Sequence, residues 1–145
     1  MEIDVQNFDV TSFLQEHRND YVVFVRGGWQ SYSKKGHYQC MLRYGHYCKR
    51  ISADLDMVRS SNVSMLQGAT AACKLLRKGN TNLYLITPTP LGFKQGQKGR
   101  GVNVELIQTI LDVCSSKNIT FHEIALHNGG DLIRSMINSQ EGRML

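Results

Sequence analysis

YVVFVRGGWQSYSKKGHYQCMLRYG, residues 21–45, is the stretch that decides the fold of this chain. Residues 21–25 are apolar, β-branched or aromatic, which is typical of a strand buried on both faces. Arg26-Gly27-Gly28 is expected to end that strand, and a turn rich in Gly, Ser and Lys follows. Residues 37–43 predict a second strand. A short turn then leads to a third strand over residues 47–52, so the three strands form an antiparallel meander.

Downstream of the meander, helix and strand patterns alternate. Residues 60–78 have a helical period, with Ser60 as a cap candidate and Gly79 as the stop. Residues 82–87 predict a fourth strand, which Pro88 ends because proline cannot donate a ladder hydrogen bond. A Gly-rich loop, a second helix, a fifth strand and a short last helix follow, at residues 91–102, 103–114, 119–126 and 131–138. This order predicts an α/β fold: a five-stranded mixed sheet, three antiparallel strands then two parallel, with helices on both faces.

The length and composition fit one domain. The 145 residues, 41% of them hydrophobic, are enough to bury one sizeable core. We assign the domain to residues 21–138, with an N-terminal appendage over residues 1–20 and a flexible tail over residues 139–145. Within the appendage, Thr11 is the expected cap of a short helix.

Charge gives the first indication of a partner. The chain carries 17 Lys and Arg against 12 Asp and Glu, a formal net charge of +5, which favours a polyanionic partner. The alternative is a protein that is basic without binding one. No run of about 18 apolar residues occurs and the N-terminus lacks a signal-peptide pattern, so no membrane association is expected.

The cysteines predict no disulfide and no metal site. Cys40, Cys48, Cys73 and Cys114 lie far apart among apolar neighbours, unlike those of a disulfide scaffold or a zinc module. They are expected to be reduced thiols in a cytoplasmic or nuclear protein. His37, Cys40, His46 and Cys48 stand closest together, but their spacing matches no common zinc pattern. We therefore expect no metal and no cofactor.

Several strings, in the same order, resemble type 1 ribonuclease H. GHYQCMLRYG (36–45) resembles the second strand of that family, and KRISADL (49–55) resembles the third. NVELIQTILDVCSSKNITFHEIALH (103–127) resembles the late helix and the fifth strand. The similarity covers residues 21–137 and implies the ribonuclease H-like fold. In that family, four carboxylates hold two Mg²⁺ ions, one to activate water and one to stabilise the leaving oxygen.

The resemblance also shows where this chain departs from the family. When the family's metal-binding carboxylates are carried over position by position, the first corresponds to Arg26, the second to Met65 and the third to Pro88. HNGGD (127–131) resembles a shortened final loop, with His127 as the loop histidine and Asp131 as the remaining acid. One carboxylate cannot hold two metal ions, so we predict a degenerate site with no catalytic residue. The alternatives are that Asp131 is a helix cap and that His127 is an ordinary loop residue.

Loss of the metals would leave the surface on which a duplex lies. In the family, that surface reads the shape of an RNA/DNA hybrid through phosphates and 2′-hydroxyls. We expect a catalytically inactive domain that binds double-stranded RNA or an RNA/DNA hybrid. In this complex, Arg26 would contact a backbone phosphate directly. The candidate nucleic-acid-binding residues are Arg26, Gly27, Gly28, Trp29, Lys34, Lys35, Arg59, Asn62, Lys94, Lys98 and Arg100. Trp29 is expected either to stack on a base or sugar or to pack as an aromatic plug at the domain edge. The loop that carries Lys94, Lys98 and Arg100 is alternatively a solvated turn without a binding role.

Two other functions stay open. One is a protein-interaction or structural module, which could also form a homodimer. Degenerate ribonuclease H-like domains have this role in larger assemblies, and retroelement polymerases, for example, can carry an inactive copy as a spacer. This function predicts no duplex binding. The other is an active metal-dependent ribonuclease H, which would need carboxylates that the sequence does not supply. A viral or mobile-element origin would suit so diverged a copy.

Overall fold

A central sheet dominates the computed structural model, which describes residues 1–77, 79–139 and 143–144. In these residues, seven strands pair in the order β1-β6-β5-β2-β3-β4-β7. The strands are β1 (Glu2–Asp4), β2 (Tyr21–Gln30), β3 (Lys35–Tyr44), β4 (Tyr47–Leu55), β5 (Thr81–Thr87), β6 (Ile119–His127) and β7 (Arg143–Met144). β2, β3 and β4 are antiparallel neighbours, whereas β5 and β6 run parallel to β2. The predicted meander and the parallel pair beside it are therefore confirmed.

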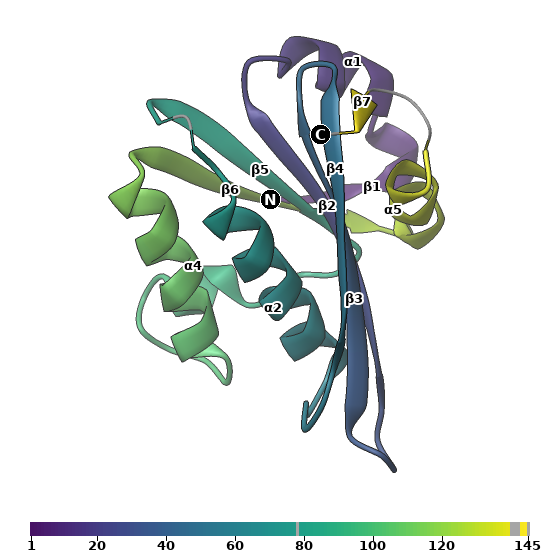
Figure 1. The fold of residues 1–145 in the computed structure, drawn as a ribbon, viewed down its shortest axis with the longest axis vertical. Coiled ribbons are helices and arrows are strands. Elements are labelled where there is room, and N and C mark those ends of the chain that lie inside the picture. Colours follow the sequence, from purple (N-terminus) through teal and green to yellow (C-terminus); the bar gives the residue numbers. More distant parts are fainter. Residues whose placement is uncertain (78, 140–142, 145) are drawn as a thin grey trace.

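Helices cover both faces of the sheet (Figure 1). One face carries α2 (Ser61–Lys74), the short α3 (Phe93–Gly96) and α4 (Val104–Ser116), and the other carries α1 (Val10–Glu16) and α5 (Gly130–Ile137). Alternate residues of β2 supply the two cores, because side chains of a strand point to opposite faces in turn. Val23 and Val25 pack on the α2 side, and Val22 and Phe24 pack on the α5 side. The predicted order of elements and the helices on both faces are confirmed.

The sheet is wider than predicted because two further strands cover its edges. β1 pairs in parallel with the end of β6, and β7 pairs in parallel with the start of β4. The five-stranded prediction missed both, since strands of two or three residues have no readable alternation. Of the predicted tail, residues 140–142 and 145 lie outside the described residues.

The first strand is also longer than predicted. We expected Arg26-Gly27-Gly28 to end it after Val25, but β2 continues to Gln30 and pairs with β3 throughout. Glycine weakens a strand without breaking its ladder, and here it makes room for neighbouring side chains. A Cβ on Gly28 would lie 2.5 Å from His37 Cε1. The glycines therefore mark close packing on a continuing strand, and the strand extends well past the body of the sheet.

The helix boundaries differ in detail from the predicted ones. Ser60 caps α2 as expected, since its hydroxyl accepts a hydrogen bond from the Val63 N–H. The helix ends at Lys74, before the predicted stop at Gly79. α1 is capped by Asp9 and not by Thr11, because the Asp9 carboxylate accepts the Ser12 N–H at 3.1 Å. That bond also lowers the pKa of Asp9. None of the described helices has the length and apolarity needed to cross a membrane.

Candidate nucleic-acid interface

The first turns of α2 are docked tightly onto the β2–β3 hairpin. Ser64 is fully buried, and its hydroxyl donates to the Gly28 carbonyl oxygen at 3.0 Å. Met65 lies against Gly27, where an added Cβ would come within 2.9 Å of the Met65 Cγ. Gly36 of β3 has even less room, since its Cβ would lie 2.5 Å from the Ser64 Oγ. The helix can approach the strands this closely because two facing positions, Gly27 and Gly36, lack side chains.

Arg26 lies on the opposite side of the sheet from α2. Val25 belongs to the α2-side core, so alternation turns Arg26 towards the α5 side. Its Nη1 donates to the Gln39 Oε1 at 3.3 Å, across the β2–β3 pair. The side chain is half-buried. β5 ends at Thr87, level with Val25, so Pro88 comes next at the end of the strand beside Arg26.

The side chains at the three positions to which the family resemblance assigns carboxylates do not fit a two-magnesium site. Mg²⁺ requires oxygen ligands, chiefly carboxylates. Arg26 brings a positive charge, Met65 is a thioether that is 3% exposed, and Pro88 has no donor atom. The Thr87 hydroxyl is fully buried and donates to the Thr89 carbonyl oxygen. Among the described residues, no group of three or more His, Cys, Asp or Glu side chains is arranged to hold a metal ion.

The last two residues of the predicted degenerate site have carboxylate or guanidinium partners at the surface. His127, at the end of β6, lies 2.8 Å from the Glu2 carboxylate of β1. Asp131 is exposed in the first turn of α5 and pairs with Arg134 of the same helix. The N-cap of α5 is Gly129, so the alternative interpretation of Asp131 as the cap is wrong.

A second group of the predicted residues lies at the far end of the β2–β3 hairpin. The exposed Lys34 adopts a left-handed conformation in the turn (φ 56°), and the exposed Lys35 starts β3. The Lys34 carbonyl oxygen accepts the Val58 N–H at 2.9 Å. The Trp29 indole N–H donates to the Val58 carbonyl oxygen, also at 2.9 Å, and the residue is 38% exposed. The hairpin is therefore fixed to the segment that precedes α2, and the indole N–H already has an intramolecular partner.

The segment that precedes α2 is joined in turn to the start of α4. Arg59 Nη2 donates to the Asn103 side-chain oxygen at 3.1 Å. Between the N-terminal ends of the two helices lies a groove of about 560 Å³, lined by Arg59, Gln67, Asn103 and Thr109 among others. Asn62 is half-buried in the first turn of α2.

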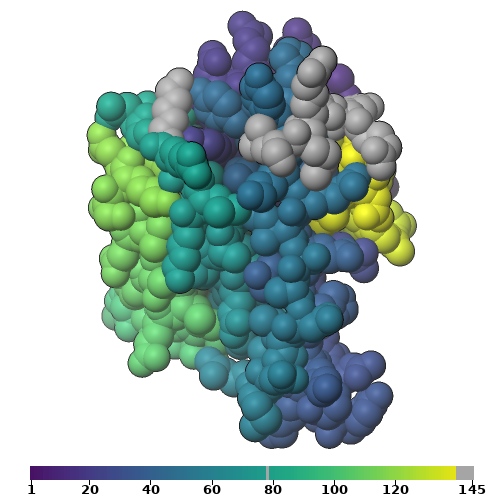
Figure 2. Space-filling view, in the orientation of Figure 1, coloured from purple at the N-terminus to yellow at the C-terminus, as the bar shows by residue number. Residues whose placement is uncertain are grey.

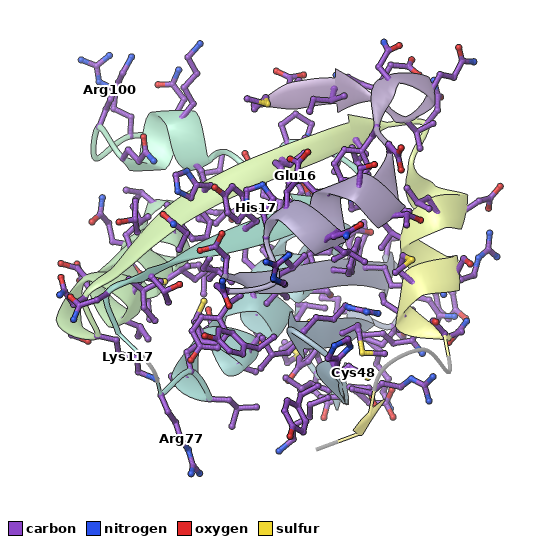
Figure 3. The ribbon with its side chains drawn as sticks, turned by 90° about the horizontal axis from the view of Figure 1, so that it is seen from above. Glu16, His17, Cys48, Arg77, Arg100 and Lys117 are labelled. Atoms are coloured by element: carbon purple, nitrogen blue, oxygen red, sulfur yellow. The ribbon has the colours of Figure 1, made fainter. Side chains whose placement is uncertain are left out.

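Lys94, Lys98 and Arg100 belong to the segment that leads to Asn103 and α4. Lys94 lies in α3, and the other two lie in the exposed loop after it. The segment is held to α4 because Gln108 donates to the Gly96 carbonyl oxygen at 2.6 Å. Figure 3 shows the Arg100 side chain extending from this loop away from the sheet.

The predicted binding residues thus form two separate groups. At one end of the molecule, the hairpin with Trp29, Lys34 and Lys35 is bonded to the segment that carries Arg59 and leads to Asn62 in α2. Arg59 in turn is bonded to Asn103, at which the α3–α4 loop ends. We call this region the basic end. Figure 2 shows the hairpin standing clear of the rest of the molecule there. Arg26 and Gln39 lie farther back on the same hairpin, on the other face of the sheet. Gly27 and Gly28 lie between the two groups. Met65 occupies the space where a side chain of residue 27 would lie, and His37 occupies the corresponding space at residue 28 on the other face of the sheet.

Sequence reasoning missed several residues at the basic end. Tyr32, at the tip of the hairpin, is 86% exposed, and Met57 and Val102 are 81% and 86% exposed. Large apolar side chains in turns are a weak signal when read from sequence, because single exposed ones are common. Their gathering at one end became visible only when the hairpin and the two helix starts were placed together.

The architecture is that of the ribonuclease H-like fold. The N-terminal ribonuclease H domain of Rv2228c from Mycobacterium tuberculosis, solved as a fusion with maltose-binding protein, matches 81% of this chain and 95% of its own, with a TM-score of 0.62 and 13% identity. LC11 ribonuclease H1, solved in complex with an RNA/DNA hybrid, matches 73% of this chain and 86% of its own, with a TM-score of 0.59 and 13% identity. No protein-family model and no curated protein matches this sequence.

Proposed function

We propose that this chain is a catalytically inactive ribonuclease H-like domain that binds double-stranded RNA or an RNA/DNA hybrid through the basic end. The observation that carries the proposal is that hydrogen bonds join three segments with exposed cationic residues at that end. Lys34 and Lys35 come from the hairpin, Arg59 from the segment before α2, and Arg100 from the loop before α4. Clusters of Lys and Arg on one side of a fold are the usual footprint of phosphate binding.

The inactivity rests on the chemistry of the side chains at the former metal positions. A guanidinium at Arg26 repels a divalent cation, and neither Met65 nor Pro88 can coordinate one. Asp131 alone would supply one carboxylate, and that carboxylate is paired with Arg134. Two-metal hydrolysis needs several acids close together. The residues present therefore favour binding without cleavage.

The site of Arg26 supports a role in binding. Its guanidinium is half-buried and has five N–H donors, of which the bond to Gln39 uses one. Arginine binds phosphate with two parallel hydrogen bonds, which Lys cannot do. One of the similar structures holds an RNA/DNA hybrid. We propose that Arg26 contacts a phosphate on the α5 side of the hairpin while the basic end contacts the same duplex farther along.

A binding assay at two salt concentrations tests this function. Labelled single-stranded RNA, double-stranded RNA, hybrid and DNA are titrated with the native protein, Arg26→Glu and the double variant Lys34→Glu/Lys35→Glu. Arg77→Glu is the matched control, because Arg77 is an exposed cation after the opposite end of α2. We expect the native protein to prefer the two RNA-containing duplexes and to bind more weakly at higher salt. Both test variants should lose about tenfold in affinity, and Arg77→Glu should bind like the native protein.

Three results would contradict the proposal. Absence of binding to every nucleic acid would favour a protein-interaction or structural module. If Arg77→Glu weakened nucleic-acid binding as much as the test variants do, the loss of affinity would be due to net charge alone and not to the basic end. Magnesium-dependent cutting of a hybrid by the pure protein, lost in Asp131→Asn, would show an active enzyme.

A further inference from the structure

Two buried cysteines from neighbouring helices lie in contact. Cys73 of α2 and Cys114 of α4 are each 1% exposed, and their sulfur atoms are 3.8 Å apart. They are 41 residues apart in the sequence, so only the packing of α2 against α4 brings them together. Cys40 of β3 belongs to the same core and Cys48 of β4 to the core on the other face of the sheet. Cys40 and Cys48 provide an internal comparison, since they are buried as well.

A lysine places a positive charge beside this pair. The Lys117 ammonium, after the end of α4, donates to the carbonyl oxygens of Cys73, Lys74 and Leu76 at 2.7–3.0 Å. It therefore satisfies carbonyl groups at the C-terminal end of α2. Figure 3 shows Lys117 at this corner of the molecule.

The two thiols differ in acidity. The hydrogen bond between the two thiols lowers the pKa of Cys114, and the charge of Lys117 lowers it further against the opposing effect of burial. The same sulfur–sulfur hydrogen bond raises the pKa of Cys73, and burial adds to the rise. Burial alone raises the pKa of Cys40 to about 12. Cys114 is thus the member of the pair that ionises first.

Cys114 also lies close to the molecular surface, although it is only 1% exposed. It lines a surface hollow of about 350 Å³ between the end of α4 and the start of β6, together with Leu111, Ser115, Asn118 and Phe121. A molecule the size of hydrogen peroxide fits such a hollow. Thiolate character combined with access is what distinguishes oxidisable cysteines from inert buried ones.

We propose that Cys73 and Cys114 form an oxidation site at which hydrogen peroxide joins α2 to α4 through a reversible disulfide. The Cys114 thiolate attacks one peroxide oxygen, the O–O bond breaks, and the departing hydroxide takes up a proton to become water. The sulfenic acid left on Cys114 is then attacked by the Cys73 sulfur. The S–S bond forms, the S–O bond breaks, and the hydroxyl leaves as water with the Cys73 proton. Two thiols and one peroxide therefore give one disulfide and two waters.

The proposed bond would join the two helices directly. A disulfide needs the sulfurs to close from 3.8 Å to about 2.05 Å. The bridge would link the C-terminal parts of the two helices, far from the basic end at their N-terminal ends. It closes a loop of 41 residues, which restricts the unfolded chain.

Mass spectrometry of the intact 145-residue chain tests the proposal. The reduced protein is treated with hydrogen peroxide, quenched, denatured and alkylated. We expect the loss of two alkylatable thiols, a Cys73–Cys114 cross-linked peptide, and full recovery with dithiothreitol. Cys73→Ser and Cys114→Ser should each abolish the bridge, while Cys40→Ser and Cys48→Ser should leave it intact.

A kinetic measurement separates the roles of the two residues. Lys117→Gln should slow bridge formation several-fold, because it removes the charge that favours the thiolate. In Cys73→Ser, Cys114 should still form a sulfenic acid that a dimedone probe captures. A bridge that includes Cys40, equal oxidation of all four thiols, or a sulfinic acid on Cys114 in the native protein would each overturn the proposal. If a serine variant fails to fold, the peptide map of the native protein decides alone.

Discussion

Asp20 shows how a single carboxylate fixes the N-terminal segment to the sheet. Its Oδ2 lies 2.9 Å from the His17 Nδ1, and its Oδ1 accepts from Thr81 and Asn82 of β5 at 3.2 and 3.1 Å. Asn82 in turn contacts the His122 Nε2 at 3.0 Å. Burial raises the pKa of Asp20, but the hydrogen bonds from His17, Asn82 and Thr81 outweigh it and lower the pKa below 3.8. The folded state therefore favours the ionised form.

This lowered pKa gives a pH-dependent prediction. Because the folded-state pKa of Asp20 lies below the unfolded value, its contribution to stability is present above about pH 4 and disappears as the pH falls through the folded value. Asp20→Ala should lower the free energy of unfolding by about 1–3 kcal/mol at pH 7, and the difference from the native protein should shrink at acid pH. Urea unfolding between pH 2.5 and 7 measures both effects.

The exposed Asp112 of α4 supplies the control. Asp112→Ala should change the free energy of unfolding by less than about 0.5 kcal/mol at every pH. A difference between Asp20→Ala and the native protein that stays constant down to pH 2.5 would show that the carboxylate charge has no part in it.

At the scale of single elements, the docking of α2 on the hairpin is the contact that shapes the candidate interface. Ser64 donates to the Gly28 carbonyl oxygen, and Met65 fills the space above Gly27. The same contact fixes Val58, which binds both Lys34 and Trp29. The position of the basic end therefore depends on the space left by a glycine in β3.

Gly36→Ala tests this dependence. The added Cβ would lie 2.5 Å from the Ser64 Oγ, 2.6 Å from the Val58 Cγ2 and 2.9 Å from the Gly28 carbonyl oxygen, so helix and hairpin must move apart. We expect a loss of about 1–3 kcal/mol in the free energy of unfolding and faster hydrogen exchange of the Val58 amide.

Gly130→Ala is the matched substitution. Gly130 starts α5, and an added Cβ there meets no atom within 4 Å. Its free energy of unfolding should stay the same or rise by up to about 1 kcal/mol, because alanine restricts the unfolded chain. Equal effects of the two substitutions would mean that the close contact at Gly36 carries no strain.

At the scale of the whole molecule, the N-terminal segment is part of the fold. Beyond the pairing of β1 with β6, Phe8 and two residues of α1, Phe13 and Leu14, pack against the α5-side core. The Phe13 ring lies 5.4 Å from that of Tyr84 on β5, edge to face. A segment described from sequence as an appendage at the domain edge thus completes both an edge and a face of the sheet.

Removal of one aromatic ring measures this contribution. Phe13→Ala should lower the free energy of unfolding by about 2 kcal/mol, because the ring also packs on Phe8 and His17. Gln15→Ala, at an exposed position of the same helix, should have little effect. Thermal unfolding followed by circular dichroism compares the two variants. An unchanged midpoint for Phe13→Ala would show that residues 1–20 fold independently of the domain.

Much of the fold followed from local patterns. The apolar run at 21–25, the helical period after Ser60 and the proline that follows β5 each fix an element without reference to distant residues. Less of the candidate site could be predicted from the sequence. The positions of Arg26, Met65 and Pro88 followed from the resemblance to a family, whereas the bonds from Trp29 and Lys34 to Val58 join residues that no spacing rule connects.

The sequence by itself determined the order of the elements, the positive charge and the identity of the side chains at the positions where the resemblance implies metal ligands. These properties depend on residue type and on neighbours within a few positions. Only the tertiary structure decided that β2 continues through its glycines, that β1 and β7 cover the edges, and that Cys73 meets Cys114. These features depend on contacts between segments far apart in the chain. Such contacts form where complementary surfaces bury apolar area, and the sequence pattern of either segment alone does not contain them.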